Sequence, residues 1–383
     1  MNDYSNRSIS RRRLLQLAGL GAFAIVVEAC ARAAAPLAGN AGSTAATSTP
    51  GATALPATVA PSPVATQALQ GVNSGSGAPV QTPSQPGQVM VTSNADFYTV
   101  YYRDDSPSMP GDWKLNVGGN VSSPLSLTLA DLQAMPAIEE MRTLECISNP
   151  AGGTLISNAV WKGVRTKDLL DRAGVKPNTI EIKLEAYDGY STAIPLDVAY
   201  DEHSFLAYEM NGQPLPIEHG KPLRCLWPGH YGMKQPKWLT TITAVTSKYL
   251  GFWEQQGWSD DALINPTSRI DLPAENATIS TPTFQAQGIG FSGASGIAKI
   301  ELSLDNGQTW QNVDLVRGPT PYVWTNWSWN GPTPANGDLT LLARVTDNSG
   351  KTMVRETPSL FGSTFPNGSA EMHPVDATVK KSG

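Results

Sequence analysis

The stretch TLECISNPAGG, residues 143–153, contains the most informative residue of the chain, Cys146. An apolar run ends at this cysteine, and a loop of Ser, Asn, Pro, Ala and Gly follows it. Loops held by a rigid scaffold carry a disproportionate share of catalytic and binding residues. Because the chain has only three cysteines, Cys146 has little chance of a disulfide partner. Its thiol is therefore a nucleophile, a metal ligand or an inert core group.

Composition restricts the kinds of site that the chain can build. The three cysteines include no close pair, which excludes a disulfide scaffold and a zinc knuckle. No Cys-x-x-Cys-His motif for haem attachment is present, and no two of the four histidines have the i,i+4 spacing of helical zinc sites. The net charge of -6 argues against nucleic acid as a partner. A bound metal must therefore take most of its ligands from something other than protein side chains.

Residues 1–30 are predicted to be an export signal. Three arginines, Arg11 to Arg13, precede an apolar stretch at residues 14–27, which is shorter than the about 20 residues of a membrane-spanning helix. A basic segment followed by a short apolar core and small residues is typical of such signals. The consecutive arginines resemble a twin-arginine signal. That route carries folded proteins, often with a cofactor already inserted.

Two features follow the apolar core of the signal. Val27-Glu28-Ala29-Cys30 resembles a lipoprotein cleavage box, although Glu28 is a poor match. Cys30 is therefore either a lipid anchor that tethers the protein to a membrane or an incidental cysteine of an ordinary signal. Residues 31–91 are mostly Ala, Pro, Thr, Ser and Gly with almost no charge. This composition cannot bury enough apolar surface to order the chain, so we expect a disordered linker.

Residues 92–263 are predicted to form a mixed α+β domain. Strands are expected near residues 115–117 and 180–186, where apolar residues alternate with polar ones. A capping box from Thr128 to Asp131 predicts a short helix that stops before Pro136. A second helix is expected over residues 167–172. The helices are short and do not alternate regularly with the strands, which favours α+β over a doubly wound sheet.

Residues 264–362 are predicted to form an all-β, immunoglobulin-like sandwich. Apolar and polar residues alternate over residues 297–304 and again over residues 339–345, and turn signals rich in Asp, Asn and Gly follow each run. Short alternating strands separated by such turns are typical of a β-sandwich. Residues 363–383 are polar and are predicted to be a flexible tail.

Several motifs that follow one another along the chain resemble the sulfite oxidase family. Those of the first domain resemble its molybdopterin domain, and IELSLDNGQTW at residues 300–310 resembles its dimerisation domain. This resemblance implies a molybdenum-molybdopterin cofactor and makes a homodimer a candidate assembly. The motifs of the first domain are TLECISNP-x-GG at 143–153, ISNA-x-W-x-GV at 156–164, DGY at 188–190, LAYEMNG at 206–212, HG-x-PLR at 219–224 and PG-x-YG-x-K-x-x-KWL at 228–239.

The resemblance assigns roles to particular residues. In this family the cofactor's sulfur atoms bind the metal, so the protein need supply one soft ligand, and the thiolate of Cys146 suits that role. Positive charge and hydrogen-bond donors for the pterin and its phosphate would come from the segment 219–237. The residues implied as cofactor contacts are Asp188, His219, Arg224, Lys234, Gln235 and Lys237. Cys225 is expected to be buried apolar packing.

The residues expected near the substrate depart from the family pattern. Sulfite oxidases place an arginine five residues after the metal-binding cysteine, and here that position is Ala151. Trp258 stands where a tyrosine is used in sulfite oxidation. Arg103, in the aromatic segment that begins at Phe97, is either an anion-binding group or a surface ion-pair partner. The alternative source of the missing positive charge is Arg103, Arg142 or Lys162.

We therefore expect an exported molybdenum oxidoreductase that transfers oxygen atoms to or from a small substrate, with sulfite or a related sulfur oxyanion as the leading candidate. An alternative is a reductase of sulfoxides, including methionine sulfoxide in proteins. A third alternative, a non-catalytic surface binding protein, leaves Cys146 unexplained. The chain contains no haem-binding domain, so a separate cytochrome or quinone-linked protein is expected to carry the electrons.

Overall fold

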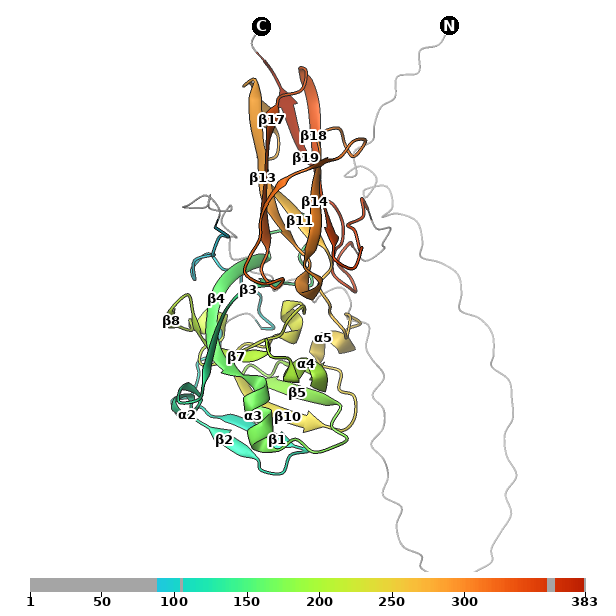
Figure 1. Cartoon of the computed structure of the whole chain (residues 1–383). Coiled ribbons are helices and arrows are strands. Elements are labelled where there is room, and N and C mark those ends of the chain that lie inside the picture. The colour runs from blue at the N-terminus through green and yellow to red at the C-terminus, as the bar shows by residue number, and fades with distance from the viewer. Residues whose placement is uncertain (1–87, 104–105, 357–361, 382–383) are drawn as a thin grey trace, which may run out of the picture. The chain divides into compact units, whose positions relative to one another are not determined.

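A computed structural model describes residues 88–103, 106–356 and 362–381, which belong to one compact unit (Figure 1). The predicted export signal, the lipidation site at Cys30 and nearly all of the predicted linker lie outside the described residues and stay predictions. No helix in the described part of the chain is long and apolar enough to cross a membrane. We call residues 92–263 the first domain and residues 264–381 the second domain.

The first domain is built on two sheets. One has the strand order β2-β1-β10-β5-β6, in which β1 and β10 are parallel and the other pairs are antiparallel. The other has the order β3-β4-β7-β8, and β9 also pairs with β7. The strands are β1 Leu115–Gly119, β2 Leu125–Leu127, β3 Ala137–Glu145, β4 Ile156–Arg165, β5 Glu181–Ala186, β6 Ser191–Pro195, β7 Phe205–Met210, β8 Gln213–Pro214, β9 Arg224–Leu226 and β10 Leu239–Val245.

The helices of the first domain are few and short. The capping box at Thr128 and Asp131 is present at the start of α2. Helix α3 ends at Gly174, whose φ of 65° is the left-handed conformation that glycine adopts most easily. Both predicted helices and both predicted strands are confirmed, but the domain is more β-rich than the α+β prediction implied. The helices are α2 Leu129–Gln133, α3 Thr166–Ala173, α4 Leu196–Tyr200 and α5 Phe252–Gln255, with 3-10 turns η1 Ile217–His219 and η2 Gly232–Lys234.

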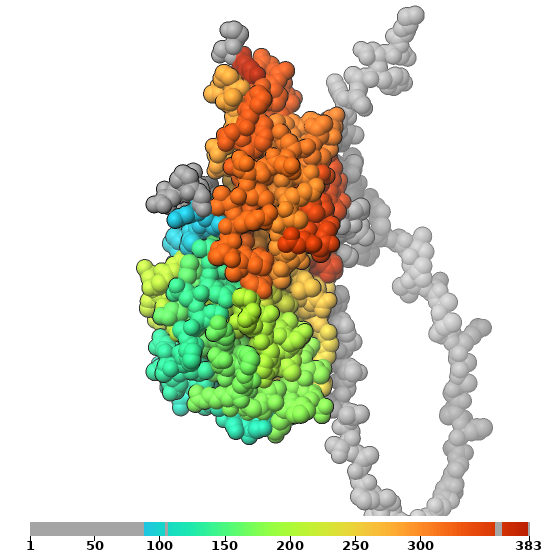
Figure 2. Space-filling view, viewed as in Figure 1, coloured from blue at the N-terminus to red at the C-terminus, as the bar shows by residue number. Residues whose placement is uncertain are grey.

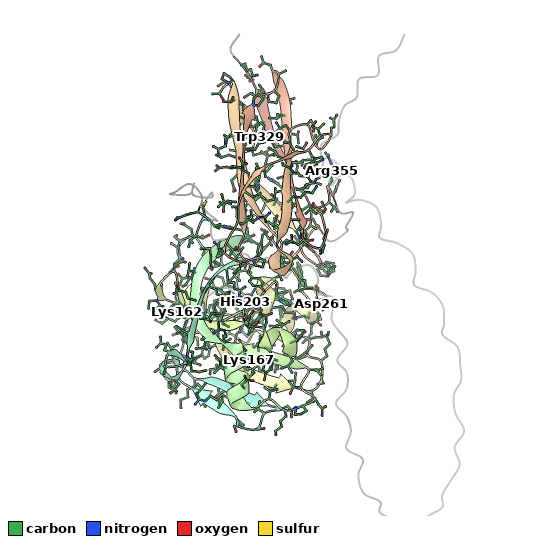
Figure 3. All side chains as sticks on the ribbon, viewed as in Figure 1. Lys162, Lys167, His203, Asp261, Trp329 and Arg355 are labelled. Atoms are coloured by element: carbon green, nitrogen blue, oxygen red, sulfur yellow. The ribbon has the colours of Figure 1, made fainter. Side chains whose placement is uncertain are left out.

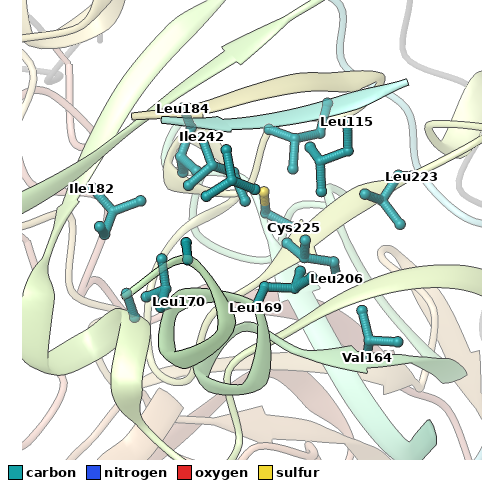
Figure 4. Close-up of a cluster of buried hydrophobic side chains, with 14 of the residues drawn as sticks. Leu115, Val164, Leu169, Leu170, Ile182, Leu184, Leu206, Leu223, Cys225 and Ile242 are labelled. Atoms are coloured by element: carbon teal, nitrogen blue, oxygen red, sulfur yellow. The ribbon is translucent and has the colours of Figure 1, made fainter. Parts of the chain in front are cut away.

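The main core of the first domain lies between helix α3 and the β1-containing sheet (Figure 4). Leu169 and Leu170 project from α3 and are fully buried together with Ile182, Leu184 and Ile242. The buried Cys225 belongs to this cluster, which agrees with its predicted role as an apolar packing group. Because β9 carries Cys225 inward, its neighbour Arg224 projects from the other face of the strand.

The second domain consists of two sheets that share one core. Their strand orders are β11-β13-β17-β16 and β12-β19-β18-β14-β15, and side chains from both sheets form a common buried cluster. The all-β prediction is confirmed, whereas the immunoglobulin-like topology stays a prediction. The strands are β11 Thr267–Leu272, β12 Ala277–Ile279, β13 Thr283–Phe291, β14 Ile297–Ser303, β15 Gln311–Asn312, β16 Asp314–Val316, β17 Thr325–Pro332, β18 Gly337–Asp347 and β19 Val375–Val379, with a 3-10 turn η3 at Gly293–Ser295.

The C-terminal segment is part of the second domain. Strand β19 lies between β12 and β18, and its residues Val375, Ala377 and Val379 are buried at alternate positions. Figure 2 shows atoms of this red segment against the orange strands that precede it. The prediction of a flexible tail over residues 363–383 is therefore wrong for β19. The polar composition of the segment obscured one short period-two pattern that fits a strand.

We predict that a charge on the inner face of β19 destabilises the second domain. Val375→Asp would bury a carboxylate without a partner, which typically costs about 3–5 kcal/mol. The free energy of unfolding should fall by that amount in a denaturant titration. Thr378→Lys, on the opposite face of the same strand and directly across from Asp338, is the control and should keep the stability of the wild type. Equal stability of both variants would contradict the placement of β19 in the sheet.

Candidate functional site

Cys146 lies directly after strand β3, at the start of the loop that returns to β4. Its backbone N–H donates to the carbonyl of Leu155 at 2.9 Å, and its carbonyl accepts from the N–H of Asn149 at 3.0 Å. The sulfur lies 3.1 Å from the Ser148 hydroxyl oxygen. Burial raises the pKa of the Cys146 thiol more strongly than Ser148 lowers it. The protein alone therefore favours the thiol, unlike sites that activate a free cysteine nucleophile by lowering its pKa.

The buried carboxyl of Glu145 shapes this loop. Its Oε1 accepts a hydrogen bond from the Asn149 side chain at 2.9 Å, and the Asn149 Oδ1 accepts one from the Leu155 N–H at 3.0 Å. Burial raises the pKa of Glu145 to about 8. Glu145 was not identified in the sequence analysis, because a single sequence does not reveal that a glutamate at this position is buried. The structure agrees with the interpretation that Asn149 shapes the loop.

Arg224 is a buried cation without a bound carboxylate. Its Nη1 donates to the carbonyl of His219 at 3.1 Å, while its Nε has no hydrogen-bond partner among the described residues. The guanidinium carbon lies 4.9 Å from the centroid of the Trp161 ring. Burial lowers the pKa of Arg224 to about 10. Burial raises the pKa of Tyr98. A Cys146 thiolate adds to this rise and the charge of Arg224 opposes it, so both groups lie close enough to Tyr98 to influence its ionisation.

Lys237 and His219 lie beside Arg224. The Lys237 ammonium donates to the carbonyl of Glu218 at 3.0 Å and lies 3.9 Å from the ring centroid of Tyr101. Burial, and then the charge of Arg224, lower the pKa of Lys237 to about 7. A ring nitrogen of His219 lies 2.7 Å from the carbonyl oxygen of Asn94, and burial lowers the pKa of this histidine to about 4.

These basic groups fit an anionic ligand. Neither Arg224 nor Lys237 forms a salt bridge among the described residues, and Arg224 also has its unpartnered Nε. Asp188 affects the pKa of Lys237, but its own pKa is raised by burial, and its Oδ1 accepts from the N–H of Tyr190 at 3.0 Å. Buried donors without an anion are costly, and a phosphate would satisfy them with charge-assisted hydrogen bonds.

Lys234 does not join this group. Its buried ammonium donates to the carbonyl of Ala193 at 3.0 Å, to Glu254 at 2.5 Å and to Asp260 at 3.1 Å. An ammonium has three donors, and protein atoms use all of them. Glu254, Asp260 and the Ala193 carbonyl leave the ammonium no free donor for a ligand, so a cofactor contact by Lys234 stays a prediction that its partners do not favour.

The Gln235 side chain is also used within its own loop. Its Oε1 accepts from the backbone N–H of Trp227 at 3.1 Å, and its Nε2 donates to the carbonyl of His230 at 2.6 Å. These two hydrogen bonds close the loop that joins β9 to η2. A direct cofactor contact by Gln235 stays a prediction.

Arg103 and Trp258 lie near different parts of the site. The Arg103 guanidinium is 5.6 Å from the Tyr102 ring centroid, and its charge offsets part of the burial that raises the pKa of Asp188. Trp258 packs against the apolar cluster that contains Ile147, the residue after the cysteine. The catalytic roles of Arg103 and Trp258 stay predictions.

The two other cations considered as substitutes for the missing arginine have protein partners. Arg142 forms a salt bridge with Glu140 at 2.7 Å and donates to the carbonyl of His203 at 2.7 Å. The Lys162 ammonium lies 3.3 Å from the Oε1 of Glu209. Lys162 and His203 are labelled in Figure 3. Arg103 is the candidate whose charge acts on Asp188, a predicted cofactor contact.

Aromatic side chains contact Lys237 and one another in this part of the domain. Tyr101 stacks on Trp238 with ring centroids 6.1 Å apart. Tyr102 contacts Phe252 edge to face at 4.6 Å and lies 5.7 Å from Tyr190. The sequence placed an aromatic segment at residues 97–102 near the metal, but it did not show that Trp238, Tyr190 and Phe252 meet this segment.

Comparison with protein families identifies both domains. Residues 103–253 match the model of the oxidoreductase molybdopterin binding domain. Residues 262–358 match the model of the Mo-co oxidoreductase dimerisation domain. The two matches follow each other along the chain in the order predicted from the sequence motifs.

Curated relatives and one solved structure agree with these matches. The uncharacterized oxidoreductase YuiH of Bacillus subtilis is 38% identical over 176 residues, which cover 45% of this chain and 84% of YuiH. Human mitochondrial sulfite oxidase is 28% identical over 306 residues, and the chain spans 56% of its length. The crystal structure of the sulfane dehydrogenase SoxCD from Paracoccus pantotrophus has the same fold, with a TM-score of 0.66 and 20% identity over 75% of this chain and 84% of that chain.

We predict that the stability of the cofactor-free protein rises with pH because of Lys237. The pKa of Lys237 is about 7 in the folded protein, against an ordinary value of 10.5. Between these pH values the unfolded chain binds more protons, so the free energy of unfolding rises by up to about 1.4 kcal/mol per pH unit. Lys237→Met should lack this contribution in denaturant titrations at pH 7 to 9.5. A slope equal to that of the wild type would contradict the burial of the ammonium.

Proposed function

This chain belongs to the sulfite oxidase family of molybdopterin-dependent oxidoreductases, and we propose that it transfers oxygen atoms to or from a small substrate in a two-electron reaction. The observation that carries this proposal is that Cys146 packs against the cluster of Tyr98 and Trp161, while the buried guanidinium of Arg224 lies over the Trp161 ring. A bound molybdenum cofactor would supply the two-electron redox centre. The non-catalytic alternative is set aside, because the family is a class of enzymes.

The residues of the chain divide the work of holding the cofactor. Cys146 would donate its thiolate to the metal, and coordination would keep the sulfur deprotonated although burial alone favours the thiol. Arg224 and Lys237 would donate hydrogen bonds to the phosphate and the pterin, and His219, whose Nε2–H is used by the Asn94 carbonyl, would accept one at Nδ1. Asp188 would accept from the pterin ring, with the Tyr190 N–H fixing its carboxyl group. The aromatic side chains beside Lys237 exclude water and so strengthen these interactions.

The substrate class depends on Ala151. A small apolar side chain at this position cannot provide the bidentate contact that an arginine makes with a sulfur oxyanion. Sulfite therefore needs another cation, and Arg103 is the candidate for this role. Sulfoxides are the second candidate, supported by Ala151 and by the uncharged rings of Tyr101 and Trp238 beside Lys237.

Location and partners follow from features outside the site. The arginine-rich N-terminal segment supports export by the twin-arginine route, and Cys30 supports a lipid anchor. The match to a dimerisation domain supports a homodimer. Electrons would pass to or from a separate carrier, a cytochrome or a quinone-linked protein.

We predict that Cys146→Ser removes catalysis while the fold remains. The variant loses the soft ligand that molybdenum prefers, so turnover should fall by at least about a hundredfold for every substrate tested. Activity is measured on purified holo-protein with sulfite, sulfoxides, methionine sulfoxide peptides and nitrate, each with a dye electron donor or acceptor. Cys225→Ala, in the core, is the control and should keep its activity per molybdenum. Retained turnover in Cys146→Ser would refute the ligand role.

We predict that Ala151→Arg shifts the preference of the enzyme toward sulfite. A guanidinium at this position restores a charge-assisted contact, worth about 1.5–3 kcal/mol, so kcat/KM for sulfite should rise by about tenfold or more. Ala151→Met, similar in length but uncharged, is the control. If both variants leave the ratio of sulfite to sulfoxide turnover unchanged, Ala151 does not select the substrate.

A further inference from the structure

The loop that carries Cys146 is in contact with the second domain. The Nη1 of Arg269, on strand β11, donates to the carbonyl of Gly153 at 3.3 Å. The His373 ring packs on Gly152, where a Cβ would lie 2.2 Å from the ring carbon Cγ. Gly152 also has a φ of 70°, which side-chain-bearing residues adopt with strain. Two side chains that are far apart in sequence thus meet the same end of one loop.

Other groups of the second domain hold the Arg269 side chain and the backbone beside His373. The Arg269 guanidinium forms a salt bridge with Asp271 at 2.6 Å, and both side chains are largely buried. His373 lies two residues before strand β19, and the N–H of its neighbour Met372 donates to the carbonyl of Val354 at 2.8 Å. The second domain therefore presents a preformed surface to the loop.

The second domain also contacts strand β3 on the other side of the cysteine. The N–H of Thr143 donates to the carbonyl of Tyr322 at 3.0 Å, and the Thr143 hydroxyl accepts from the N–H of Trp324 at 2.9 Å. The ring of Tyr322 lies 4.1 Å from the guanidinium carbon of Arg142. Cys146 is thus positioned between two points, Thr143 and Gly152-Gly153, that the second domain contacts.

We infer that the second domain, beyond any role in dimerisation, positions the Cys146 loop for metal ligation, and that Arg269 and His373 are the positioning residues. Neither residue needs to touch the substrate in this role. Misplacement of a reacting group by about 1 Å can lower a rate by about a hundredfold, so small shifts of the loop should affect kcat. The inference rests on the proposed function in one respect, the assignment of Cys146 as the ligand.

The first test uses the cofactor-free protein, so it does not depend on activity. The variants are His373→Ala and the double variant Arg269→Gln with Asp271→Asn, which leaves no buried carboxylate unpaired. Amide hydrogen exchange is measured over residues 146–155, whose amides at Gly153 and Leu155 are hydrogen-bonded within the loop. We expect exchange at these amides to become about tenfold faster, which corresponds to about 1.4 kcal/mol of lost protection. Exchange rates equal to those of the wild type in both variants would overturn the inference.

A matched control separates positioning from general destabilisation. Arg344→Gln breaks a similar ion pair in the second domain, with Glu301 at 2.9 Å, but removes no contact to the Cys146 loop that the structure shows. It should leave loop exchange unchanged. Faster loop exchange in Arg344→Gln to the same extent as in the double variant would also overturn the inference.

The second test uses the holo-protein. Molybdenum content, the thiolate-to-metal absorption band and the kinetic constants are measured for the same variants. We expect unchanged molybdenum content, a shifted band, and a kcat about tenfold lower with an unchanged KM. Arg269→Lys, which keeps a donor and a charge, should restore part of the loss. The inference would be overturned if molybdenum content fell in proportion to kcat while the absorption band stayed unshifted. The two residues would then act only on the stability of the fold. Failure of the ligand assignment would appear separately, as turnover retained by Cys146→Ser.

Discussion

Arg224, Lys237 and His219 lie in the interior of the first domain, and no carboxylate is hydrogen-bonded to any of them in the described part of the chain. Most proteins pair a buried cation or move it to the surface. Here the other interactions keep the group in place without an anion: backbone carbonyls accept from each side chain, and the rings of Trp161 and Tyr101 lie over the two cations. The folded protein therefore holds unsatisfied positive potential, which a cofactor phosphate would neutralise.

The same constraint explains why Lys234 differs from its neighbours. It lies three residues before Lys237 and is fully buried, but Glu254 and Asp260 accept its hydrogen bonds. Glu254 is on α5 and also accepts from the hydroxyl of Thr192 at 2.6 Å. Charge pairing thus separates a structural lysine from one left open to an anion. Spacing along the chain cannot make this distinction, because both carboxylates come from a later segment.

Local patterns predicted the regular elements well, since alternation, a capping box and a glycine at a helix end each have a local physical cause. The alternation in residues 297–304 became β14, and the capping box at Thr128 begins α2. The site was predictable in part, through motifs that resemble a family. Contacts between distant segments were not predictable. The sequence does not reveal that Glu145 is buried. The position of His373 depends on strand β19, which the polar composition of the C-terminal segment concealed.

Strand β19 also bears on the order of events during biosynthesis. It pairs with β12, about a hundred residues earlier, and with β18, so the second domain depends on contacts that span a large part of the chain. Such long-range pairing is slow compared with local structure. His373 reaches Gly152 only when this last strand is in place. The Cys146 loop would therefore be completed late, after most of the chain has been synthesised. The proposed twin-arginine route, which carries folded proteins, would suit a loop that is completed so late.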